Sequence, residues 1–440
     1  MSNESKAHEY RFDTKRVRAG YEPKEHNQAV SPPIYQSAAW DFRDVEHAKL
    51  LFTLQELGNL YTRVGNPTVG VLEQRVAALD GAAGAIALAS GMAAITYTLL
   101  NLAEGGGRIL TSPYLYGGST DSFKKMYPKL GIHFDFAKNI LNPAKLAEEI
   151  TPDTRAIFIE SISNPNTVLL DVDAIAQVAH EHGIPLVVDN TVATPYLFNP
   201  IAHGADIVVY SATKGLNGHG NLIGGLVLES GKFNWKSDRF PHFSEKYYTL
   251  RDPKDNSRHR DFLEVFPDFP FTMRIRFNHL NYFGAALSPF DAYLAIIGLE
   301  TLSERLEKQS RNALAVAEYL SAHPQVEWVR YPALKSSPSY ALYQRDFKKG
   351  AGGILAFGFK GTVEQKTKFL NSVELFHYHV NIGDARSLIV NSPQTTHHEL
   401  EADEKIVADI PENLIRISAG LEDPLDLIDD LEQAFKKAIG

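Results

Sequence analysis

The sequence predicts an α/β fold with a mostly parallel central sheet and a smaller C-terminal α+β domain. Between residues 66 and 230, short apolar runs alternate with segments of helical spacing. Two of these runs, IPLVVDNT and IVVYSATK, end at polar side chains, Asp189 and Lys214. Strands that alternate with helices form parallel sheets covered on both faces, and functional side chains gather at the carboxyl ends of such strands.

The expected elements follow from this alternation. A helix should begin at the Asn66-Pro67 pair, because Asn caps a helix and Pro fits its first turn. Further helices are expected at 91–102, 121–131, 142–150 and 171–183. Strands are expected at 83–90, 108–114, 132–137, 155–163, 186–190, 207–213 and 224–230. Because most of the connections are helical, the sheet should be mostly parallel.

The chain is expected to divide into three parts. Residues 1–65 have no clean period and should form an N-terminal arm that lies on another surface. Residues 66–287 should form the α/β domain, with a long insertion loop at about 232–280, where charged and aromatic residues are dense. Residues 288–440 should form an α+β domain with one or two long helices from Pro289 and an amphipathic final helix at 424–439.

Composition excludes several classes of function. The 440-residue chain has a net charge of −9 and no long basic block, so nucleic-acid binding has no electrostatic support. It has no cysteine, which excludes disulfides, thiolate metal sites and a cysteine nucleophile. That composition suits a reducing compartment, and the polar start, MSNESKAHEYRFDTK, does not resemble a secretory signal. We therefore expect a cytoplasmic protein.

One uncharged stretch, residues 82–103, is long enough to span a membrane. It is dominated by Ala, Gly, Ser and Thr, and Ser90-Gly91 divides it. We therefore expect a buried strand followed by a buried helix, and no membrane partner.

The pair Lys214 and Asp189 indicates a specific chemistry. A lysine at a strand end can form an imine, and a carboxylate at the next strand end can face a pyridinium nitrogen. A pyridoxal-phosphate (PLP) site needs these two groups. The alternative interpretation is an ordinary α/β protein in which both residues merely end strands.

Ser90-Gly91-Met92 lies between an expected strand and an expected helix, where bare backbone amides can hold a phosphate. Ser211 and Thr213 would add hydroxyl donors from another strand end. The alternative for the Gly91 turn is a tight turn without a ligand.

Three further residues have two interpretations each. Arg63 could pair with a phosphate or lie solvated on the surface. Tyr116 could stack on a planar ring or pack in the core. Arg416 interrupts an apolar strand pattern, so it could bind a substrate carboxylate or a structural one.

The histidines do not predict a metal site. The pair at 180 and 182 lacks the i, i+4 spacing of a helical zinc motif. The pair at 377 and 379 has no evident third ligand, and the pair at 397 and 398 lies in an expected loop.

Nine blocks of the chain, in order, resemble the Cys/Met-metabolism family of PLP enzymes. They are YTRVGNPTVGVLEQRVAALDG, ASGMAA, YLYGGST, ESISNPN, VVDNTVATPY, SATKGLNGHGNLIGG, NIGDARSL, TTHHEL and IRISAGLED. The resemblance covers essentially the whole chain. It implies the PLP-dependent transferase fold of type I, which is the fold of aspartate aminotransferase.

The resemblance also implies residue roles. Lys214 would be the Schiff-base lysine, Asp189 the partner of the ring nitrogen, and Tyr116 the ring-stacking residue, and these three would be the catalytic residues. Asn164 would approach the ring hydroxyl. The phosphate would be held by Gly91, Met92, Ser211 and Thr213, and by Tyr61 and Arg63 of a neighbouring subunit. Arg416, with Asn381 nearby, would hold the substrate carboxylate.

Within the family, three features resemble the sulfhydrylase branch: the GHG run after Lys214, the long insertion, and NIGDA, where many relatives have a serine in place of Asn381. The implied reaction is γ-replacement, in which O-acetyl-L-homoserine and sulfide become L-homocysteine and acetate. Shared sites imply at least a dimer, and the expected assembly is a homotetramer. The 232–280 insertion could line the active-site entrance and select a small sulfur donor.

Alternatives remain on the same site: a cystathionine γ-synthase, which uses cysteine, or a γ-lyase, which lets water finish the reaction. A nucleotide-binding dehydrogenase is disfavoured because no G-x-G-x-x-G follows the first strand. Some residues depart from the family pattern, namely Arg18 in place of a usual histidine, GLNGHGNLIGG after the lysine, and VNSPQTTH in place of HPASTTH. The last of these leaves the exact substrate open.

Overall fold

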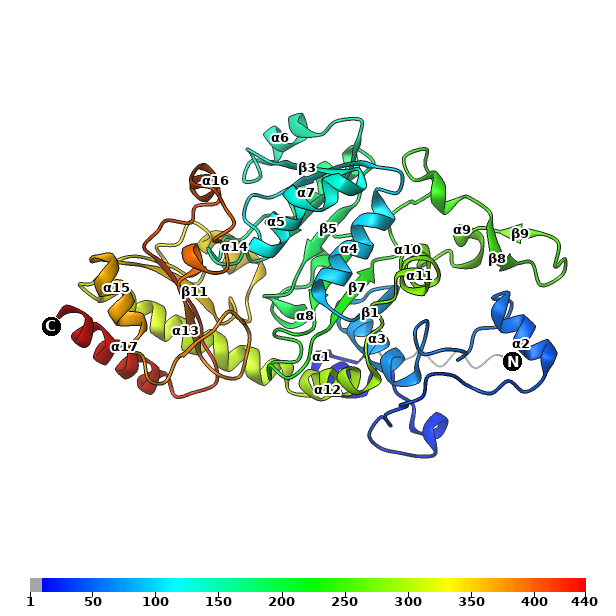
Figure 1. The fold of residues 1–440 in the computed structure, drawn as a ribbon, viewed down its shortest axis with the longest axis horizontal. Coiled ribbons are helices and arrows are strands. Elements are labelled where there is room, and N and C mark those ends of the chain that lie inside the picture. The colour runs from blue at the N-terminus through cyan, green and yellow to red at the C-terminus, as the bar shows by residue number, and fades with distance from the viewer. Residues whose placement is uncertain (1–9) are drawn as a thin grey trace.

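The structure is a computed structural model that describes residues 10–440. Two sheets organise it: a seven-stranded sheet in the middle of the view and a five-stranded sheet in the C-terminal part, coloured yellow to red (Figure 1). The polar start of the chain, on which we based the absence of a secretory signal, lies partly outside the described residues. The three-part division at residues 65 and 287 stays a prediction.

The large sheet confirms the α/β prediction and is mixed rather than wholly parallel. Its strands are β1 (Gly84–Leu88), β2 (Gly107–Thr111), β3 (Ile132–Phe136), β4 (Thr154–Glu160), β5 (Leu186–Asp189), β6 (Ile207–Ser211) and β7 (Gly225–Glu229). Their order across the sheet is β1-β7-β6-β5-β4-β2-β3. Strand β7 runs antiparallel to both of its neighbours, whereas the other four pairings are parallel.

Helices cover both faces of this sheet, as expected for parallel strands. They are α3 (Pro67–Asp80), α4 (Gly91–Leu102), α5 (Gly117–Lys125), α6 (Pro143–Leu146), α7 (Val172–Glu181) and α8 (Thr194–Leu197). Helix α3 begins as predicted, because the Asn66 side chain accepts a hydrogen bond from the Thr68 amide at 3.0 Å and Pro67 occupies the first turn.

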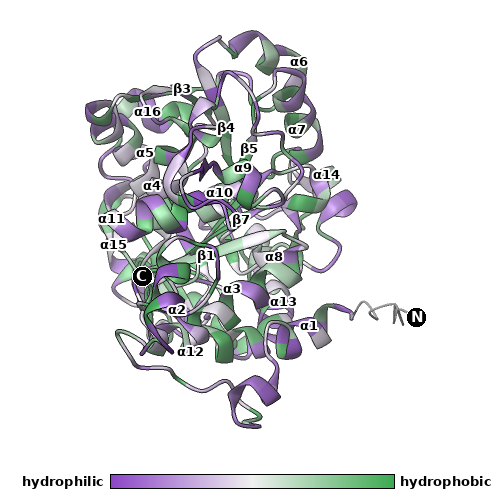
Figure 2. Ribbon diagram, turned by 90° about the vertical axis from the view of Figure 1, so that its right-hand side faces the viewer, coloured by the Kyte–Doolittle hydropathy of each residue, from purple (hydrophilic) through white to green (hydrophobic). Residues whose placement is uncertain are grey.

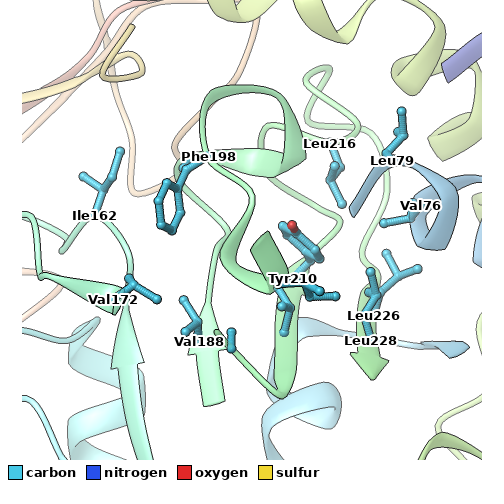
Figure 3. Close-up of a cluster of buried hydrophobic side chains, with 14 of the residues drawn as sticks. Val76, Leu79, Ile162, Val172, Val188, Phe198, Tyr210, Leu216, Leu226 and Leu228 are labelled. Carbon is cyan, nitrogen blue, oxygen red and sulfur yellow. The ribbon is translucent and has the colours of Figure 1, made fainter. Parts of the chain in front are cut away.

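Alternate strand residues enter two separate cores. Val188 of β5, Tyr210 of β6 and Leu226 of β7 belong to the cluster that also contains Val76 of α3 (Figure 3). Val187, the preceding residue of β5, belongs to the cluster on the opposite face. In the ribbon coloured by hydropathy, purple and green residues alternate along the helices that surround the sheet, as expected for helices that pack on it with one side (Figure 2).

The uncharged stretch at 82–103 forms β1 and the buried helix α4, as expected. Among the residues that the structure describes, no helix is both long and apolar enough to cross a membrane.

The arm and the insertion contain more regular structure than the sequence predicts. Residues 10–65 include α1 (Phe12–Arg18), a short 3-10 helix (Pro23–His26) and α2 (Val45–Phe52). The expectation of a loop at 232–280 is wrong. The segment carries the hairpin β8 (Tyr247–Arg251) and β9 (His259–Arg260), then α9 (Phe262–Val265), α10 (Pro270–Arg274) and a π-helix (Ile275–Leu280) that leads into α11 (Asn281–Phe283). Its aromatic residues pack into several small clusters, which leaves no single period.

The C-terminal part has a five-stranded sheet of order β10-β11-β14-β13-β12. Its strands are β10 (Val326–Arg330), β11 (Ile354–Phe359), β12 (His377–Tyr378), β13 (Leu388–Val390) and β14 (Leu414–Ser418). Its helices are α12 (Pro289–Glu300), α13 (Leu302–Ala322), α14 (Tyr340–Asp346), α15 (Val363–Leu370), α16 (Ala402–Val407) and α17 (Pro424–Ile439). The helical stretch expected from Pro289 is therefore two helices, which meet at Thr301.

Candidate active site

A cavity of about 270 Å³ opens at the carboxyl ends of β4, β5 and β6. It is lined by Ser90, Gly91, Met92, Ile95, Tyr116, Ser119, Glu160, Ile162, Asn164, Asp189, Thr191, Val192, Ser211, Thr213, Lys214, Ile223, Val380, Ile382 and Thr396. Most of the site residues proposed from the sequence line this one cavity. Arg416 and Asn381 contact lining residues from behind the wall.

Lys214 lies three residues beyond the end of β6, in a turn. The Lys214 amide donates a hydrogen bond to the Ser211 carbonyl at 3.1 Å, which closes this turn. Its Nζ donates a hydrogen bond to Asn381 Oδ1 at 2.6 Å. Burial, and then the positive charge of Arg416, lower the pKa of Lys214 from 10.5 to about 8. A lowered pKa leaves a larger fraction of the amine unprotonated near neutral pH, which imine formation and proton transfer both need.

Asp189 ends β5 and faces the same cavity. Burial raises its pKa to about 6, against the hydrogen bond that the Thr191 amide donates to Asp189 Oδ1 at 3.0 Å. A carboxylate withdrawn from water has a strong preference for a cationic partner. A protonated pyridine nitrogen is such a partner.

The turn at Gly91 fits a phosphate cradle. Ser90 caps α4 by accepting a hydrogen bond from the Ala93 amide at 3.0 Å, and the first two residues of the helix, Gly91 and Met92, line the cavity. Gly91 lies so close to β6 that a Cβ there would be 2.7 Å from the Ser211 Cβ. The end of β6 and the start of α4 are thus in contact, which brings the Ser211 hydroxyl beside Gly91. Thr213 lines the same cavity, and its hydroxyl accepts a hydrogen bond from the Gly224 amide at 3.0 Å.

Arg416 lies on β14 and is 1% exposed. Its Nη1 donates to Asn164 Oδ1 at 3.2 Å, and its Nη2 donates to the carbonyls of Asn381 at 3.0 Å and Val380 at 3.2 Å. Its Nε has no partner, and burial lowers its pKa to about 10. No carboxylate pairs with this guanidinium within the part of the chain that the structure describes, so it suits an anionic ligand.

Tyr116 is the residue before α5, and 43% of its surface is exposed. Its ring covers Gly118, where a Cβ would lie 2.6 Å from a ring carbon. An exposed ring on the cavity wall, rather than in the core, suits stacking on a planar ligand.

Tyr61 and Arg63 do not reach this cavity. They lie side by side in the arm, with the Arg63 guanidinium 5.2 Å from the centre of the Tyr61 ring. Their expected role at the phosphate of a second subunit stays a prediction.

The 232–280 insertion also contributes no residue to the cavity wall of its own chain, contrary to the expectation that it lines the entrance there. It packs on the arm instead. Arg276 Nη1 donates to the Val64 carbonyl at 2.8 Å, and the Arg251 amide donates to the Thr53 carbonyl at 3.2 Å.

Sequence reasoning missed Glu160, Thr191, Ser119 and Thr396, all of which line the cavity. For Glu160 a signal was available, because the run AIFIE ends at a carboxylate as LVVD does at Asp189. Thr191 follows Asp189 by two residues, and its hydroxyl accepts a hydrogen bond from the Ser211 amide at 2.8 Å. Thr396 lies in the TTHHEL block, but nothing in that block places it at the cavity, because it comes from the C-terminal part of the chain.

Among the described residues, one group could offer three ligand atoms to a cation: Asp173, His203 and Asp346. Arg345 already pairs with Asp173 at 3.4 Å and with Asp346 at 2.7 Å. The group lies outside the cavity and includes none of the histidine pairs considered from the sequence.

Four features of the site fit the chemical groups of PLP and of an amino acid bound to it. They are an amine of lowered pKa, a buried carboxylate across from it, a cradle that a Cβ at Gly91 would fill, and a buried guanidinium with an unpartnered Nε. Lys214 would hold the cofactor covalently, and Asp189 would face its ring nitrogen.

Comparisons with known proteins agree with this fit. The family described as Cys/Met metabolism PLP-dependent enzyme matches residues 13–436. An O-acetyl-L-homoserine sulfhydrylase of Leptospira meyeri is 42% identical over 99% of this chain and 99% of its own length. A homocysteine synthase of Schizosaccharomyces pombe is 42% identical over 97% of this chain and 98% of its own.

The fold comparison gives the same answer. A crystal structure of the Campylobacter jejuni metY product, which contains N'-pyridoxyl-lysine-5'-monophosphate, superposes with a TM-score of 0.91 at 37% sequence identity. The match covers 97% of this chain and all of that one. Sequence, fold and site geometry together show that the chain belongs to the Cys/Met-metabolism family of PLP-dependent enzymes, with relatives of the sulfhydrylase type.

Proposed function

We propose that this enzyme converts O-acetyl-L-homoserine and sulfide into L-homocysteine and acetate by γ-replacement. The observation that carries the proposal is the Lys214 amine, whose pKa is lowered to about 8 and which is held by Asn381 at the cavity. Similarity to proteins named O-acetyl-L-homoserine sulfhydrylase, at about 40% identity over the full length, supports this choice of substrate.

Each residue has a task in this reaction. Bound PLP supplies an electron sink for the carbanion that forms when a substrate carbon loses a proton. Lys214 takes that proton and returns it to a neighbouring carbon, because its amine is partly unprotonated near neutral pH. Asp189 holds a proton on the ring nitrogen by its negative charge. Arg416 binds the α-carboxylate and orients the amino acid.

The cavity wall favours a small sulfur donor. It includes the apolar side chains of Ile162, Val192, Ile223, Val380 and Ile382. Of the lining residues, all in the described part of the chain, Lys214 alone carries a positive charge. A second amino acid such as cysteine would bring another carboxylate, for which this wall offers no second cation. Sulfide needs none.

The test is a product assay on the purified protein with PLP, O-acetyl-L-homoserine and sulfide. We expect homocysteine, and loss of its formation in Lys214→Ala. Lys366→Ala is the matched control, because Lys366 is also buried but bonds Asn391 Oδ1 at 3.3 Å, away from the cavity. Cystathionine formed from cysteine, or a 2-oxoacid formed without any donor, would instead assign the synthase or lyase activity.

We also propose that two chains share each site, and that a homotetramer of two such dimers forms. The support is that Tyr61 and Arg63 lie outside the cavity of their own chain. Mixing inactive Lys214→Ala protein with weakened Arg63→Ala protein tests this. In hybrid dimers one site would have both residues intact, so activity should return on mixing. No regain after subunit exchange would contradict shared sites.

A further inference from the structure

Glu160 is a buried acid at the site to which the reaction assigns no task. It ends β4 and is 5% exposed. Its Cα is paired in register with that of Asp189, at the end of the neighbouring strand β5. Both side chains line the cavity.

Its carboxyl group joins two loops that come from different strands. Oε1 accepts a hydrogen bond from the Tyr116 amide at 2.6 Å, in the loop after β2. Oε2 accepts one from the Asn164 amide at 3.2 Å, in the loop after β4. Asn164 in turn accepts a hydrogen bond from Arg416 at 3.2 Å. One side chain therefore connects the ring-stacking residue to the residue that orients the carboxylate-binding arginine.

We propose that Glu160 is a positioning residue, which fixes the main chain at Tyr116 and at Asn164 and so sets the spacing of the walls around the cofactor ring. The inference rests on the PLP site of the proposed function. Glu160 acts through Tyr116 and Asn164, and it exchanges no proton with the substrate.

The two acceptor oxygens explain why a carboxyl group is needed here. A carboxylate has acceptors on both oxygens, whereas an amide has one acceptor and one donor group. Glu160→Gln keeps the size of the side chain but turns an N–H group toward one of the two backbone N–H groups. That backbone group then stays buried without a partner, and one loop is released.

The matched control is Glu229, which ends β7 and is 1% exposed. It also accepts two backbone bonds, from the Phe271 amide at 3.2 Å and the Thr272 amide at 2.9 Å. It lies at the opposite end of the strands from the cavity, because the antiparallel β7 pairs Glu229 with Ile207, the first residue of β6, and Gly225 with Ser211, its last. Glu229→Gln should lower stability without touching the cofactor.

The experiment compares wild-type protein, Glu160→Gln and Glu229→Gln in four measurements: the dissociation constant for PLP, the circular dichroism of the cofactor band, KM against kcat for O-acetyl-L-homoserine, and thermal unfolding. We expect Glu160→Gln to weaken PLP binding by about tenfold to hundredfold, the cost of one backbone N–H that stays buried without a partner. Its cofactor dichroism should fall and its KM should rise, while Glu229→Gln matches the wild type in all three.

The same four measurements can also overturn the proposal. Wild-type PLP affinity, dichroism and KM in folded Glu160→Gln would overturn the proposal, whatever its unfolding temperature. Should Glu160→Gln fail to fold, Glu160→Asp decides, because a side chain shorter by one carbon cannot keep both of these hydrogen bonds. Weaker PLP binding supports the proposal, and wild-type binding overturns it. A wild-type protein that binds no PLP would sink the proposed function itself.

Discussion

Replacing Arg416 with methionine should raise the pKa of Lys214. Burial is the larger cause of the lowered pKa, and the positive charge of Arg416 is the smaller one. Methionine removes the charge and keeps the site apolar. The amine should therefore stay easier to deprotonate than an ordinary lysine, but less so than in the wild type.

The magnitude follows from the two pKa values. With a pKa of about 8, about 9% of Lys214 is free amine at pH 7, against about 0.03% at the ordinary value of 10.5. The site thus increases the reactive fraction about 300-fold. Arg416 contributes the smaller part of this pKa shift, so the pKa of Lys214 in Arg416→Met should lie between about 8 and about 9. The fraction of free amine at pH 7 should then be up to about tenfold lower than in the wild type.

The assay follows capture of PLP by the apoenzyme through the band near ~420 nm. Initial rates at a series of pH values give the midpoint for Lys214. Arg274→Met is the control, since Arg274 is also buried but bonds Asn101 Oδ1 at 2.6 Å. A wild-type midpoint near 10.5 would refute the effect of burial. An unchanged or lower midpoint in Arg416→Met would refute the effect of the charge.

Three other substitutions give sharp expectations. Burial raises the pKa of Asp80 to about 7, so the folded state binds this proton more tightly than the unfolded state does. The free energy of unfolding of the wild type should therefore fall by about 1.4 kcal/mol per pH unit between about pH 4 and 7. Asp80→Asn lacks this loss, so unfolding scans should show its stability relative to the wild type increasing over that range and staying constant above it. Gly117→Ala should lower the unfolding temperature, because its Cβ would collide with the Thr396 carbonyl. Gly70→Ala on α3 should not, because its Cβ would meet only the Gln74 side chain, at 3.9 Å. Arg276→Met frees the arm at Val64 and should weaken PLP binding about tenfold; unchanged binding would show that the insertion does not position the arm.

The sequence predicts the alternating elements well, because each buried strand or helix has its own apolar period. Helix α4 has the predicted bounds, 91–102. Helix α5 differs from its predicted bounds, 121–131. It begins at Gly117, where the glycine fits against the Thr396 carbonyl, a contact from a distant part of the chain. It ends at Lys125, and the chain continues as a 3-10 helix at Tyr127-Pro128, since proline cannot continue an α-helix.

The site could be predicted where a strand end carries its chemistry, as at Asp189 and Lys214. Glu160 has the same position, within the expected strand at 155–163. A glutamate at the end of a strand is usually solvated, so only its hydrogen-bond partners show that it belongs to the site. Asn381 and Arg416 come from the C-terminal part, so their distance from Lys214 depends on how two sheets pack. No local pattern encodes that distance.

The direction of β7 has a consequence for the cofactor site. An apolar run such as GGLVLES has no direction of its own, so the sequence does not reveal that this strand runs antiparallel. Gly225, its first residue, is paired with Leu88 on one side and Ser211 on the other. A Cβ at Gly225 would lie 2.1 Å from the Ser90 carbonyl oxygen, so the strand and the start of α4 are in direct contact. Because β7 begins at this end of the sheet with a glycine, no side chain keeps Ser90 and Gly91 away from the strand, and Gly91 also lies against Ser211.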